Sequence, residues 1–455
     1  MPAAPAIAAG PAPDVAVIGA GVIGLTVACA LAEAGASVAV VERGPVAGPQ
    51  ACSWGNTGWI GPGGVVPIAN PTLLRQGLRS LADPTGPFGL APGAVLRHPG
   101  FFARFLAACR PGRVARGTAA LSELKRGAVA AWRALAEAEE PGFPVLATPK
   151  LVAYATQAGL EAGVREAELI RAHGGRVDIL DPAEIAGALP GCRLSSVGAQ
   201  RFPDDGAVDP AAALAALAER ARRRGVAILD RTAVTGAEIE HGRLGALWTE
   251  AGRLPLGLAV LAAGAESARL GRLFGLGLPL LPGRGIALTV PGGAGAPPMP
   301  VLLAEGKVAV TPFGDRLRFA GTLELGEGRS QVDPRRLEGL RRTIGRFLPD
   351  LALPAERATW AGLRPVTPDG LPLIGRPSRL DGLLVATGHA MIGMGQAPAT
   401  ARLVTDLVLG LRPTISAAVL AAIDPDRFAP PRRRSRTTTV EAPAAAAAGT
   451  PETLP

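Results

Sequence analysis

The sequence predicts an α/β protein in which a Rossmann-like domain is interleaved with an α+β domain built on an antiparallel sheet. Three observations support this class. Residues 14–43 contain a strand, a glycine turn, a helix and a second strand in order. Apolar and polar residues alternate between residues 278 and 323, as in antiparallel strands. Glycine-rich segments and a final helix follow residue 360, which indicates a return to the first domain.

The first unit begins with Val15–Ile18, a short apolar run typical of a buried parallel strand. A complete G-x-G-x-x-G follows at residues 19–24. Gly19 permits the tight turn, Gly21 lets the backbone approach a pyrophosphate, and Gly24 lets the next helix lie close to the strand. That helix is expected over residues 22–34 and directs its N-terminal amides at the phosphates.

A second strand is expected over residues 37–41, with Glu42 at its end. A carboxylate there accepts hydrogen bonds from both ribose hydroxyls and repels the additional phosphate of NADP. A lone G-x-G-x-x-G is a weak signal in a chain with 60 glycines. Because all five parts occur in order, the unit predicts a dinucleotide site rather than a glycine-tolerant turn in an ordinary α/β core. It does not separate NAD from FAD.

The rest of the chain alternates between helical and strand patterns. Helices are expected at 73–81, 99–138 with a break at 111–112, 161–174, 181–189, 209–225, 333–347 and 398–409. Strands are expected at 145–155, 226–229, 233–240, 243–248, 256–262, 278–290, 301–312 and 317–323.

This order predicts two discontinuous domains with a cleft between them. The cofactor domain is expected to comprise residues 14–85, 205–275 and 355–428, and the substrate domain residues 86–204 and 276–354. The leader, 1–13, and the Pro/Arg/Thr/Ala-rich tail, 429–455, are expected to be disordered.

The composition argues against several classes of protein. The 47 Lys and Arg against 38 Asp and Glu give a net charge of +9, but the charge is scattered and lacks an aromatic-interleaved basic face. Nucleic-acid binding is therefore not expected. The four cysteines and four histidines do not cluster, so neither a metal site nor a disulfide framework is expected.

The same sequence predicts where the protein works. No apolar run approaches the roughly 18 residues that a membrane-spanning helix needs. The Ala/Pro-rich start lacks the features of a secretory signal. A cytoplasmic protein is expected, with peripheral association at the inner face of the cell membrane left open.

Five segments carry a resemblance to a known family. They are residues 14–43, Ser-Trp-Gly-Asn-Thr-Gly at 53–58, Val-Leu-Ala-Ala-Gly at 260–264, Trp-Ala-Gly-Leu-Arg-Pro-Val-Thr-Pro-Asp-Gly at 360–370, and Thr-Gly-His at 387–389 before the last helix. Over residues 14–425 the chain resembles the D-amino-acid oxidase superfamily of FAD-dependent oxidoreductases. Its closest likeness there is to bacterial D-amino-acid dehydrogenases and D-hydroxyproline dehydrogenases. The resemblance implies FAD, since an NAD dehydrogenase needs neither of the last two segments.

The resemblance also implies which residues hold the FAD. A flavin's pyrimidine edge gains negative charge on reduction, so the amides that open the last helix are expected to face it. None of the four cysteines lies where the sarcosine-oxidase type attaches its flavin, so FAD is expected to be noncovalent. The expected cofactor residues are Gly19, Gly21, Val22, Ile23, Gly24, Glu42, Arg43, Ser53, Gly55, Asn56, Thr57, Gly58, Val234, Ala263, Gly264, Gly388, Ile392, Gly393 and Met394.

Two residues are expected to act at the substrate. In similar oxidases the arginine matching Arg364 binds the substrate carboxylate, a task that suits a guanidinium fork. The alternative is an arginine tied to a nearby carboxylate such as Asp369. His389 is expected to contact the isoalloxazine, with a structural histidine as the alternative.

The implied reaction is oxidative deamination of a D-amino or D-imino acid by hydride transfer from the α-carbon to flavin N5. The electrons are expected to pass to a quinone or another carrier. Two alternatives stay open: a glycine/sarcosine-type oxidase that uses O2, and the flavoprotein subunit of a heteromeric complex.

One departure bears on the substrate. Residues 284–287 are Arg-Gly-Ile-Ala where D-amino-acid dehydrogenases often have Lys-Gly-Tyr-Ser. If that tyrosine faces the substrate, its absence favours a small imino acid such as D-proline or D-hydroxyproline. Trp54 and Trp59 would then shape the pocket.

Overall fold

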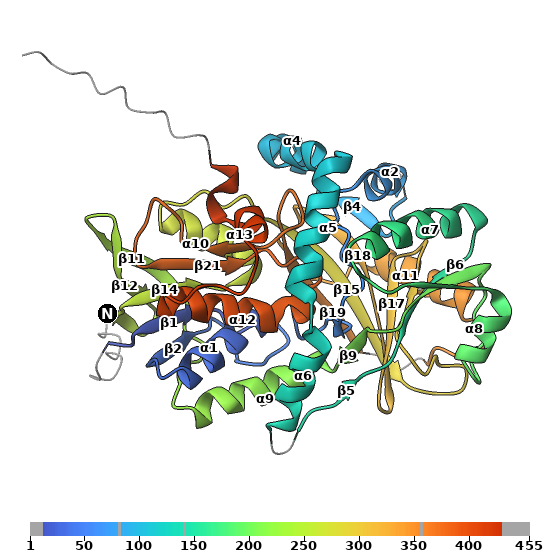
Figure 1. Cartoon of the computed structure of the whole chain (residues 1–455), viewed down its shortest axis with the longest axis horizontal. Helices are drawn as coiled ribbons and strands as arrows, with labels where there is room; N and C mark the ends of the chain where they lie inside the picture. Colours follow the sequence, from blue (N-terminus) through green and yellow to red (C-terminus); the bar gives the residue numbers. More distant parts are fainter. Residues whose placement is uncertain (1–11, 81–82, 140–141, 355–357, 430–455) are drawn as a thin grey trace, which may run out of the picture.

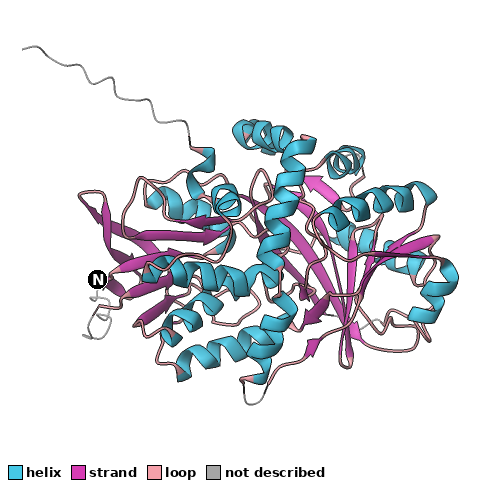
Figure 2. Cartoon of the chain, in the orientation of Figure 1, coloured by secondary structure: helices cyan, strands magenta, loops and turns pink. Residues whose placement is uncertain are grey.

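The computed structural model describes residues 12–80, 83–139, 142–354 and 358–429. Two sheets organise this part of the chain, one on each side of the long helix α5, Pro111–Lys125 (Figures 1 and 2). A small sheet of β3, Trp59–Ile60, β9, Gly206–Val208, and β5, Val145–Leu146, joins segments from both sides. The predicted fold class is therefore confirmed.

The first sheet has six strands, five of them parallel neighbours, with β20 antiparallel at one edge. Its order is β10, Ala227–Leu229; β2, Val38–Val41; β1, Val15–Ile18; β14, Leu258–Leu261; β21, Leu383–Thr387; and β20, Leu373–Gly375. Both faces are covered, which explains why these strands are continuous apolar runs.

The two faces of the first sheet carry different layers. Val15 and Val17 pack against the helices α1, Val22–Glu33, α9, Pro210–Arg223, and α12, Gly393–Leu409. Ala16 and Ile18 point to the other face. That face is covered by α10, Ser267–Leu273, and by a sheet of β11, Val234–Glu240, β12, Arg243–Thr249, and β13, Gly252–Pro255.

The second sheet has nine strands and is mainly antiparallel. Its order is β19, Ala358–Val366; β15, Leu281–Pro291; β18, Arg316–Leu325; β17, Val308–Phe313; β16, Val301–Leu303; β6, Lys150–Tyr154; β8, Gly198–Phe202; and β7, Asp178–Leu180, with β4, Phe88–Leu90, also beside β18. α11, Pro334–Phe347, packs on one face, and α7, Gln157–Ala172, and α8, Pro182–Ala188, lie at the β7 end.

The remaining described helices lie around these sheets. They are α2, Pro71–Ser80; α3, Ala94–Arg97; α4, Pro99–Ala108; α6, Ala128–Glu137; α13, Ala417–Ile423; and the 3₁₀ turns η1, Gly264–Glu266, and η2, Pro425–Phe428. None of the helices described is both long and apolar enough to cross a membrane. The predicted domain boundaries stay a prediction. β19, from the segment predicted for the cofactor domain, pairs with β15 in the second sheet.

The last long helix corrects the sequence prediction. It was expected to cover about residues 398–409. Instead α12 begins at Gly393, and Pro398 lies inside it. Pro398 has no N–H for the carbonyl of Met394, which would otherwise be its helical partner. The indole Nε1 of Trp132, on α6, donates to that carbonyl at 2.8 Å and satisfies it.

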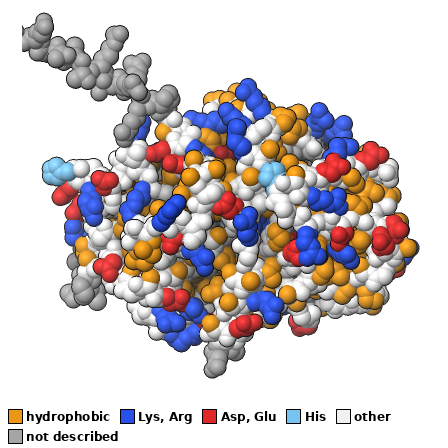
Figure 3. All heavy atoms as spheres, viewed as in Figure 1, with side chains coloured by type: hydrophobic (Ala, Val, Ile, Leu, Met, Phe, Trp, Pro, Cys, Tyr) orange, Lys and Arg blue, Asp and Glu red, His pale blue; other side chains and the backbone are white. Residues whose placement is uncertain are grey.

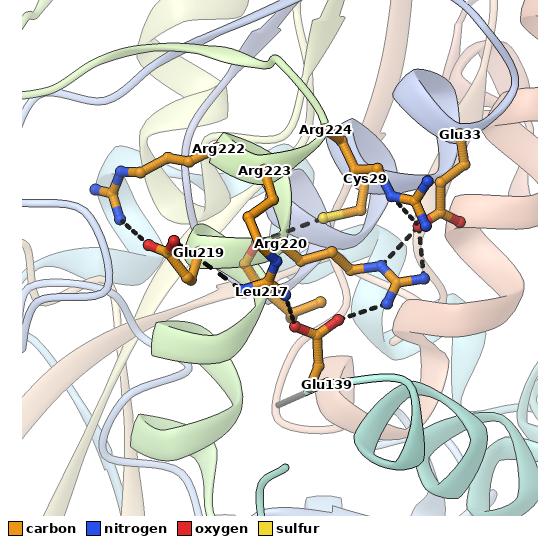
Figure 4. A network of polar contacts seen from close by, with 9 residues as sticks. All are labelled: Cys29, Glu33, Glu139, Leu217, Glu219, Arg220, Arg222, Arg223 and Arg224. Atoms are coloured by element: carbon orange, nitrogen blue, oxygen red, sulfur yellow. Dashed lines mark hydrogen bonds and ion pairs between the residues drawn. The ribbon is translucent and has the colours of Figure 1, made fainter. Parts of the chain in front are cut away.

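An ionic network ties α6 to the first domain (Figure 4). The buried carboxylate of Glu139, just after α6, accepts hydrogen bonds from Arg220 and Arg223 of α9. Arg220 also donates to Glu33, at the end of α1, at 2.6 Å. Loss of Glu139 would remove the buried partner of both arginines and leave Glu33 as the close acidic partner of Arg220, and breaking a buried ion pair is strongly destabilising.

We therefore expect Glu139→Ala to lower the free energy of unfolding by about 3 kcal/mol. Glu219→Ala is the matched control, because Glu219 is an exposed carboxylate of α9 that pairs with Arg222 at 3.5 Å and with Arg223 only at 4.0 Å. Its expected effect is at most about 0.5 kcal/mol. Urea denaturation of the two variants measures the difference, and equal losses would show that the buried network does not join the domains.

Candidate active site

A cavity opens at the carboxyl ends of β1 and β14, where an open parallel sheet binds its ligands. With its open mouth it holds about 1350 Å³ of empty space. All three predicted cofactor-side segments contribute to its wall. The predicted residues that line it are Gly19, Gly21, Val22, Ile23, Glu42, Arg43, Ser53, Asn56, Val234, Ala263, Gly264, His389, Gly393 and Met394.

The glycines of the first turn form a cradle that side chains would fill. A Cβ on Gly24 would lie 1.8 Å from the carbonyl oxygen of Gly19, so the helix could not lie this close. Gly19 has φ +104°, and a Cβ there would meet Ala262 O at 2.7 Å. Gly21 faces the cavity, and a Cβ there would meet only the Ser53 Oγ, at 3.5 Å.

Backbone N–H groups and the carboxylate of Glu42 lie next to this glycine turn. The N–H of Val22, in the first turn of α1, donates to Ser53 Oγ at 3.1 Å. The first turn of α1 contains no acidic residue that would repel a phosphate. The carboxylate of Glu42 accepts from the amides of Ala20 at 2.7 Å and Gly44 at 3.0 Å. Each of its oxygens keeps a further acceptor position for a ribose hydroxyl.

The 53–58 loop is held against the second sheet. The guanidinium of Arg318, on β18, is almost fully buried and donates to the carbonyls of Trp54 at 3.0 Å and Asn56 at 3.1 Å. Thr311 Oγ1, on β17, donates to Thr57 O at 3.0 Å. Asn56 Nδ2 donates to Met391 O at 3.2 Å, so the loop also contacts the segment before α12.

Some predicted cofactor residues lie behind the cavity wall. A Cβ on Gly55 would meet the Trp360 ring at 2.1 Å, and one on Gly58 would meet Val208 O at 1.8 Å. Gly388 has φ +81° and packs against Thr367. These residues support the wall without forming it. Predicted residues outside the lining are Gly24, Gly55, Thr57, Gly58, Gly388, Ile392 and Arg364.

His389 lines the cavity as a neutral histidine. Its Nε2 shares a hydrogen bond of 3.0 Å with Thr400 Oγ1 on α12. Burial lowers the pKa of His389 from its usual value to about 3. The side chain therefore holds the turn before α12 in place and carries no charge at neutral pH.

This pKa predicts a contribution to acid sensitivity. Between pH 6.5 and about 3, His389 is neutral when folded and protonated when unfolded, so its stabilising effect is complete above pH 6.5 and is lost as the pH falls. The free energy of unfolding should fall by up to about 1.4 kcal/mol per pH unit from this group. His389→Gln should show a shallower decline in Tm between pH 6.5 and 4.5, and an unchanged slope would contradict the assignment.

Arg364 lies on β19 beside the cavity wall formed by Leu363 and Pro365. Its guanidinium crosses the neighbouring strand at Gly285, where a Cβ would lie 2.2 Å from Cζ. Nη1 donates to the carbonyl of Thr322. No carboxylate among the described residues forms an ion pair with Arg364. Asp369, the expected alternative partner, instead pairs with Arg427 at 2.8 and 2.9 Å.

The carbonyl that Arg364 contacts belongs to a strained position. Thr322 has φ +61°, which is unusual for a β-branched residue. The register of β15 and β18 shifts here, between Arg284 and Ile286, as at a β-bulge. Bulges next to active sites re-aim side chains, and strain is retained where surrounding structure fixes it. Burial lowers the pKa of Arg364, but a guanidinium remains charged at working pH.

Within residues 284–287, the side chain that takes the place of the family's tyrosine, Ile286, lies away from this arginine. Ile286 is buried in the cluster that includes Leu340 and Ile344 of α11. Gly285 faces Arg364 instead. Trp54 and Trp59 do not line the cavity; Trp54 stacks on Arg318, and Trp59 Nε1 donates to Thr311.

Several lining residues were not predicted. Cys52 precedes the predicted Ser53 and lies close enough to Arg364 for its charge to favour the thiolate, although burial still raises the pKa of the thiol to about 11. Its position next to a predicted loop could have indicated it. Ser330 follows β18, and no motif in the sequence around it indicates a cofactor-binding residue. The unpredicted lining residues with polar side chains are Gln50, Cys52, Thr232, Glu266, Arg269, Ser330 and Thr387.

Together these features define a dinucleotide-binding protein. Three features suit the binding of a dinucleotide: the glycine turn, the absence of acidic residues from the first turn of α1, and the carboxylate of Glu42. The second helix start, at α12, also lacks an acidic residue in its first turn and suits the negative edge of a flavin. Among the described residues, no group of three or more His, Cys, Asp or Glu is placed to hold a metal ion.

Comparison with known proteins extends this assignment. The model of the DAO family, described as FAD dependent oxidoreductase, matches residues 14–407. D-amino acid dehydrogenase from Cereibacter sphaeroides is 32% identical over 428 residues, which cover 92% of this chain and 96% of the relative. D-amino acid dehydrogenase from Rhodopseudomonas palustris is 31% identical over 410 residues, 89% of this chain and 96% of the relative.

Solved structures share the fold. Glycine oxidase from Geobacillus kaustophilus has a TM-score of 0.70 at 24% identity, covering 90% of this chain and 98% of its own. L-proline dehydrogenase from P. horikoshii has a TM-score of 0.67 at 23% identity, covering 91% and 97%. The chain belongs to the DAO family of FAD-dependent oxidoreductases. Its cofactor is FAD, as predicted.

Noncovalent attachment of the FAD stays a prediction. Of the four cysteines, Cys52 lines the cavity, and its raised pKa keeps it a neutral thiol. We expect acid precipitation to release all of the yellow colour into the supernatant. Flavin fluorescence that remains with the denatured protein band, and disappears in Cys52→Ser, would instead identify a covalent bond.

Proposed function

We propose that the protein oxidises a D-amino or D-imino acid and passes the electrons to a quinone or another carrier. The observation that carries the proposal is the guanidinium of Arg364, which lies beside the cofactor cavity and has no carboxylate partner among the described residues. An amino-acid carboxylate supplies the missing anion. The names of the relatives support the D configuration.

Arg364 has the geometry to receive that carboxylate. Nη1 is committed to Thr322 O, which fixes the side chain over Gly285. Nε and Nη2 have no partner among the described residues, and together they present two parallel N–H groups. A bidentate pair of this kind fixes the orientation of the substrate as well as its position. The α-carbon can then be directed at the cofactor in a near-attack arrangement.

Other residues complete the chemistry. Bound FAD would supply the site, at N5, that receives the hydride of the substrate α-carbon, and would pass two electrons to the acceptor. We expect the amides of Gly393 and Met394, which line the cavity at the start of α12, to hold its pyrimidine edge. His389 stays neutral and orients this turn through Thr400.

No protein base is needed for the C–H step. The neutral amine nitrogen supplies the electron pair as hydride leaves, and an iminium forms on the substrate. Water then replaces the nitrogen, so that a primary D-amino acid yields a 2-oxo acid and ammonium. A quinone acceptor requires an encounter at the inner face of the cell membrane, where the sequence left peripheral association of a cytoplasmic protein open.

Product analysis tests the proposal. The purified enzyme should form a 2-oxo acid and ammonium from D-alanine or other D-amino acids, or a cyclic imine from D-proline, with a soluble quinone or dye as acceptor. L-amino acids should give none. Turnover of glycine or sarcosine with O2 consumption and peroxide formation would favour the oxidase alternative. No product from any amino acid would refute the substrate class and leave the FAD assignment in place.

A further inference from the structure

We propose that the helices α2, α3 and α4 form a docking face for a membrane surface that contains anionic lipids. We use the name α2–α4 face for the exposed apolar side chains Leu78, Val95, Leu96 and Leu106 and the exposed arginines Arg75, Arg79, Arg97 and Arg110, which these helices and the turn after α4 carry. It lies outside the cofactor cavity, and its binding does not depend on the proposed substrate.

The apolar part of the face is unusually exposed. Leu96 is 86% exposed, Leu78 61%, Leu106 55% and Val95 47%. These are four of the ten large hydrophobic side chains that are exposed in the described part of the chain, and they fall within one short segment. Clustered exposed apolar groups, especially with a polar rim, mark interaction surfaces.

The three helices lie together at one edge of the molecule. Leu74 of α2 packs with Phe105, Ala108 and Cys109 at the end of α4, and α3 directly precedes α4. Figure 1 places α2 and α4 along the upper edge, next to β4. In the space-filling view basic and apolar side chains alternate along this edge (Figure 3).

The positive charge of residues 67–122 favours anionic lipids as the binding partner of the α2–α4 face. Residues 67–122 contain seven arginines and a single acidic residue, Asp83. Among the residues described, none of the seven arginines forms an ion pair; Arg97 and Arg104 donate to the backbone carbonyls of Pro92 and Phe428. Anionic lipids attract such unpaired arginines, while the exposed leucines can enter the headgroup and acyl boundary. An acidic protein partner would explain the arginines but not the exposed leucines.

The face is connected to the cofactor site through α4. Phe101 and Phe105 pack in one apolar cluster with Leu323 and with Met391, which lies between His389 and α12. Docking through α2–α4 would therefore bring the bilayer to the side of the molecule where α4 packs near the segment between His389 and α12. A lipid-soluble acceptor would be presented to that side.

Co-sedimentation with vesicles tests the proposal on the holoenzyme. Vesicles of phosphatidylcholine alone are compared with vesicles that also contain phosphatidylglycerol, at low salt and at high salt. Binding is expected only to the anionic vesicles and should weaken at high salt, because salt screens the arginines. Arg75→Gln with Arg79→Gln should weaken binding about thirtyfold, since each basic residue near the surface contributes about 1 kcal/mol. Leu78→Glu with Leu96→Glu should weaken it at least as much.

Leu273→Glu with Arg272→Gln, on α10, is the matched control, because it changes an exposed leucine and an exposed arginine elsewhere. It should leave vesicle binding within about twofold of the wild type, well inside 1 kcal/mol. Equal losses in the control and the α2 variants would show attraction by the net charge of the whole chain and overturn the proposal. Failure of the wild type to bind anionic vesicles would overturn it too, and would turn attention to an acidic protein.

Dye-linked turnover of D-amino acids is measured on the same samples. Vesicle binding without turnover would refute the proposed substrate and retain the docking face. Turnover without vesicle binding would refute the face alone. Flavin content and far-UV circular dichroism confirm that each exposed-site variant is folded.

Discussion

Replacing Arg364 by alanine is expected to lower kcat/KM for a D-amino acid about a thousandfold, with the FAD content unchanged. The variant loses two charge-assisted hydrogen bonds to the substrate carboxylate, each worth about 2 kcal/mol. FAD should be retained because Arg364 is not among the residues that line the cofactor cavity. Steady-state kinetics and the flavin-to-protein ratio measure the two effects separately.

Two further variants sharpen this result. Arg364→Lys keeps the charge but not the fork, so it should recover only part of the lost activity, mainly as a lower KM than the alanine variant. Arg284→Ala is the control on the adjacent strand, because Arg284 pairs with Glu324 at 2.7 Å. It is expected to change KM less than about threefold, or well under 1.4 kcal/mol. Similar kinetics for Arg364→Ala and the wild type would remove Arg364 from the substrate site.

Gly24→Ala is expected to abolish FAD binding. The added Cβ would lie 1.8 Å from the carbonyl oxygen of Gly19, so α1 must move away from the turn that faces the pyrophosphate. We expect a colourless protein with at least a tenfold lower flavin content, which corresponds to about 1.4 kcal/mol or more of lost affinity. Absorbance of the purified protein, with and without added FAD, measures this loss.

Gly345→Ala serves as the matched control. Gly345 lies inside α11, and a Cβ there would meet nothing within 4 Å. The same substitution should therefore stabilise the protein by about 0.5–1 kcal/mol and leave the FAD content unchanged. A yellow, fully loaded Gly24→Ala protein would show that the close approach of α1 to the turn is not required for the cofactor.

The first unit was predictable because its determinants are local. Gly19, Gly21 and Gly24 act on a turn and a helix that are contiguous with them, and the strands on either side are uninterrupted apolar runs. Glu42 could be placed because the end of the second strand is fixed by the same pattern. A local pattern with a physical reason at each position therefore predicted both the fold class and the cofactor turn.

The surroundings of Arg364 could not be predicted in the same way. Whether this arginine is free depends on Asp369, and Asp369 is occupied by Arg427 from η2, 58 residues further along the chain. Its orientation depends on Gly285 and on the backbone of Thr322, which come from two other strands. These are long-range contacts, and the sequence around residue 364 does not predict them.

The start of α12 shows the same limit. Pro398 indicated a helix start, but the indole of Trp132 satisfies the carbonyl that Pro398 leaves without a donor. The helix can therefore begin five residues earlier, at Gly393. This matters for the site, because Gly393 and Met394, in the first turn of α12, line the cavity. Cys52 was missed for a different reason, since it precedes a recognisable loop and belongs to no recognisable motif itself.

The central claim is that Arg364 directs the α-carbon of a D-amino or D-imino acid toward the FAD. Anaerobic mixing of the yellow enzyme with matched D and L enantiomers tests it most directly, with the visible flavin absorbance as the signal. We predict rapid bleaching by a D-amino or D-imino acid, no bleaching by its L enantiomer, and bleaching slowed by orders of magnitude in Arg364→Ala. Equal bleaching by both enantiomers, or bleaching that does not depend on Arg364, would contradict the account.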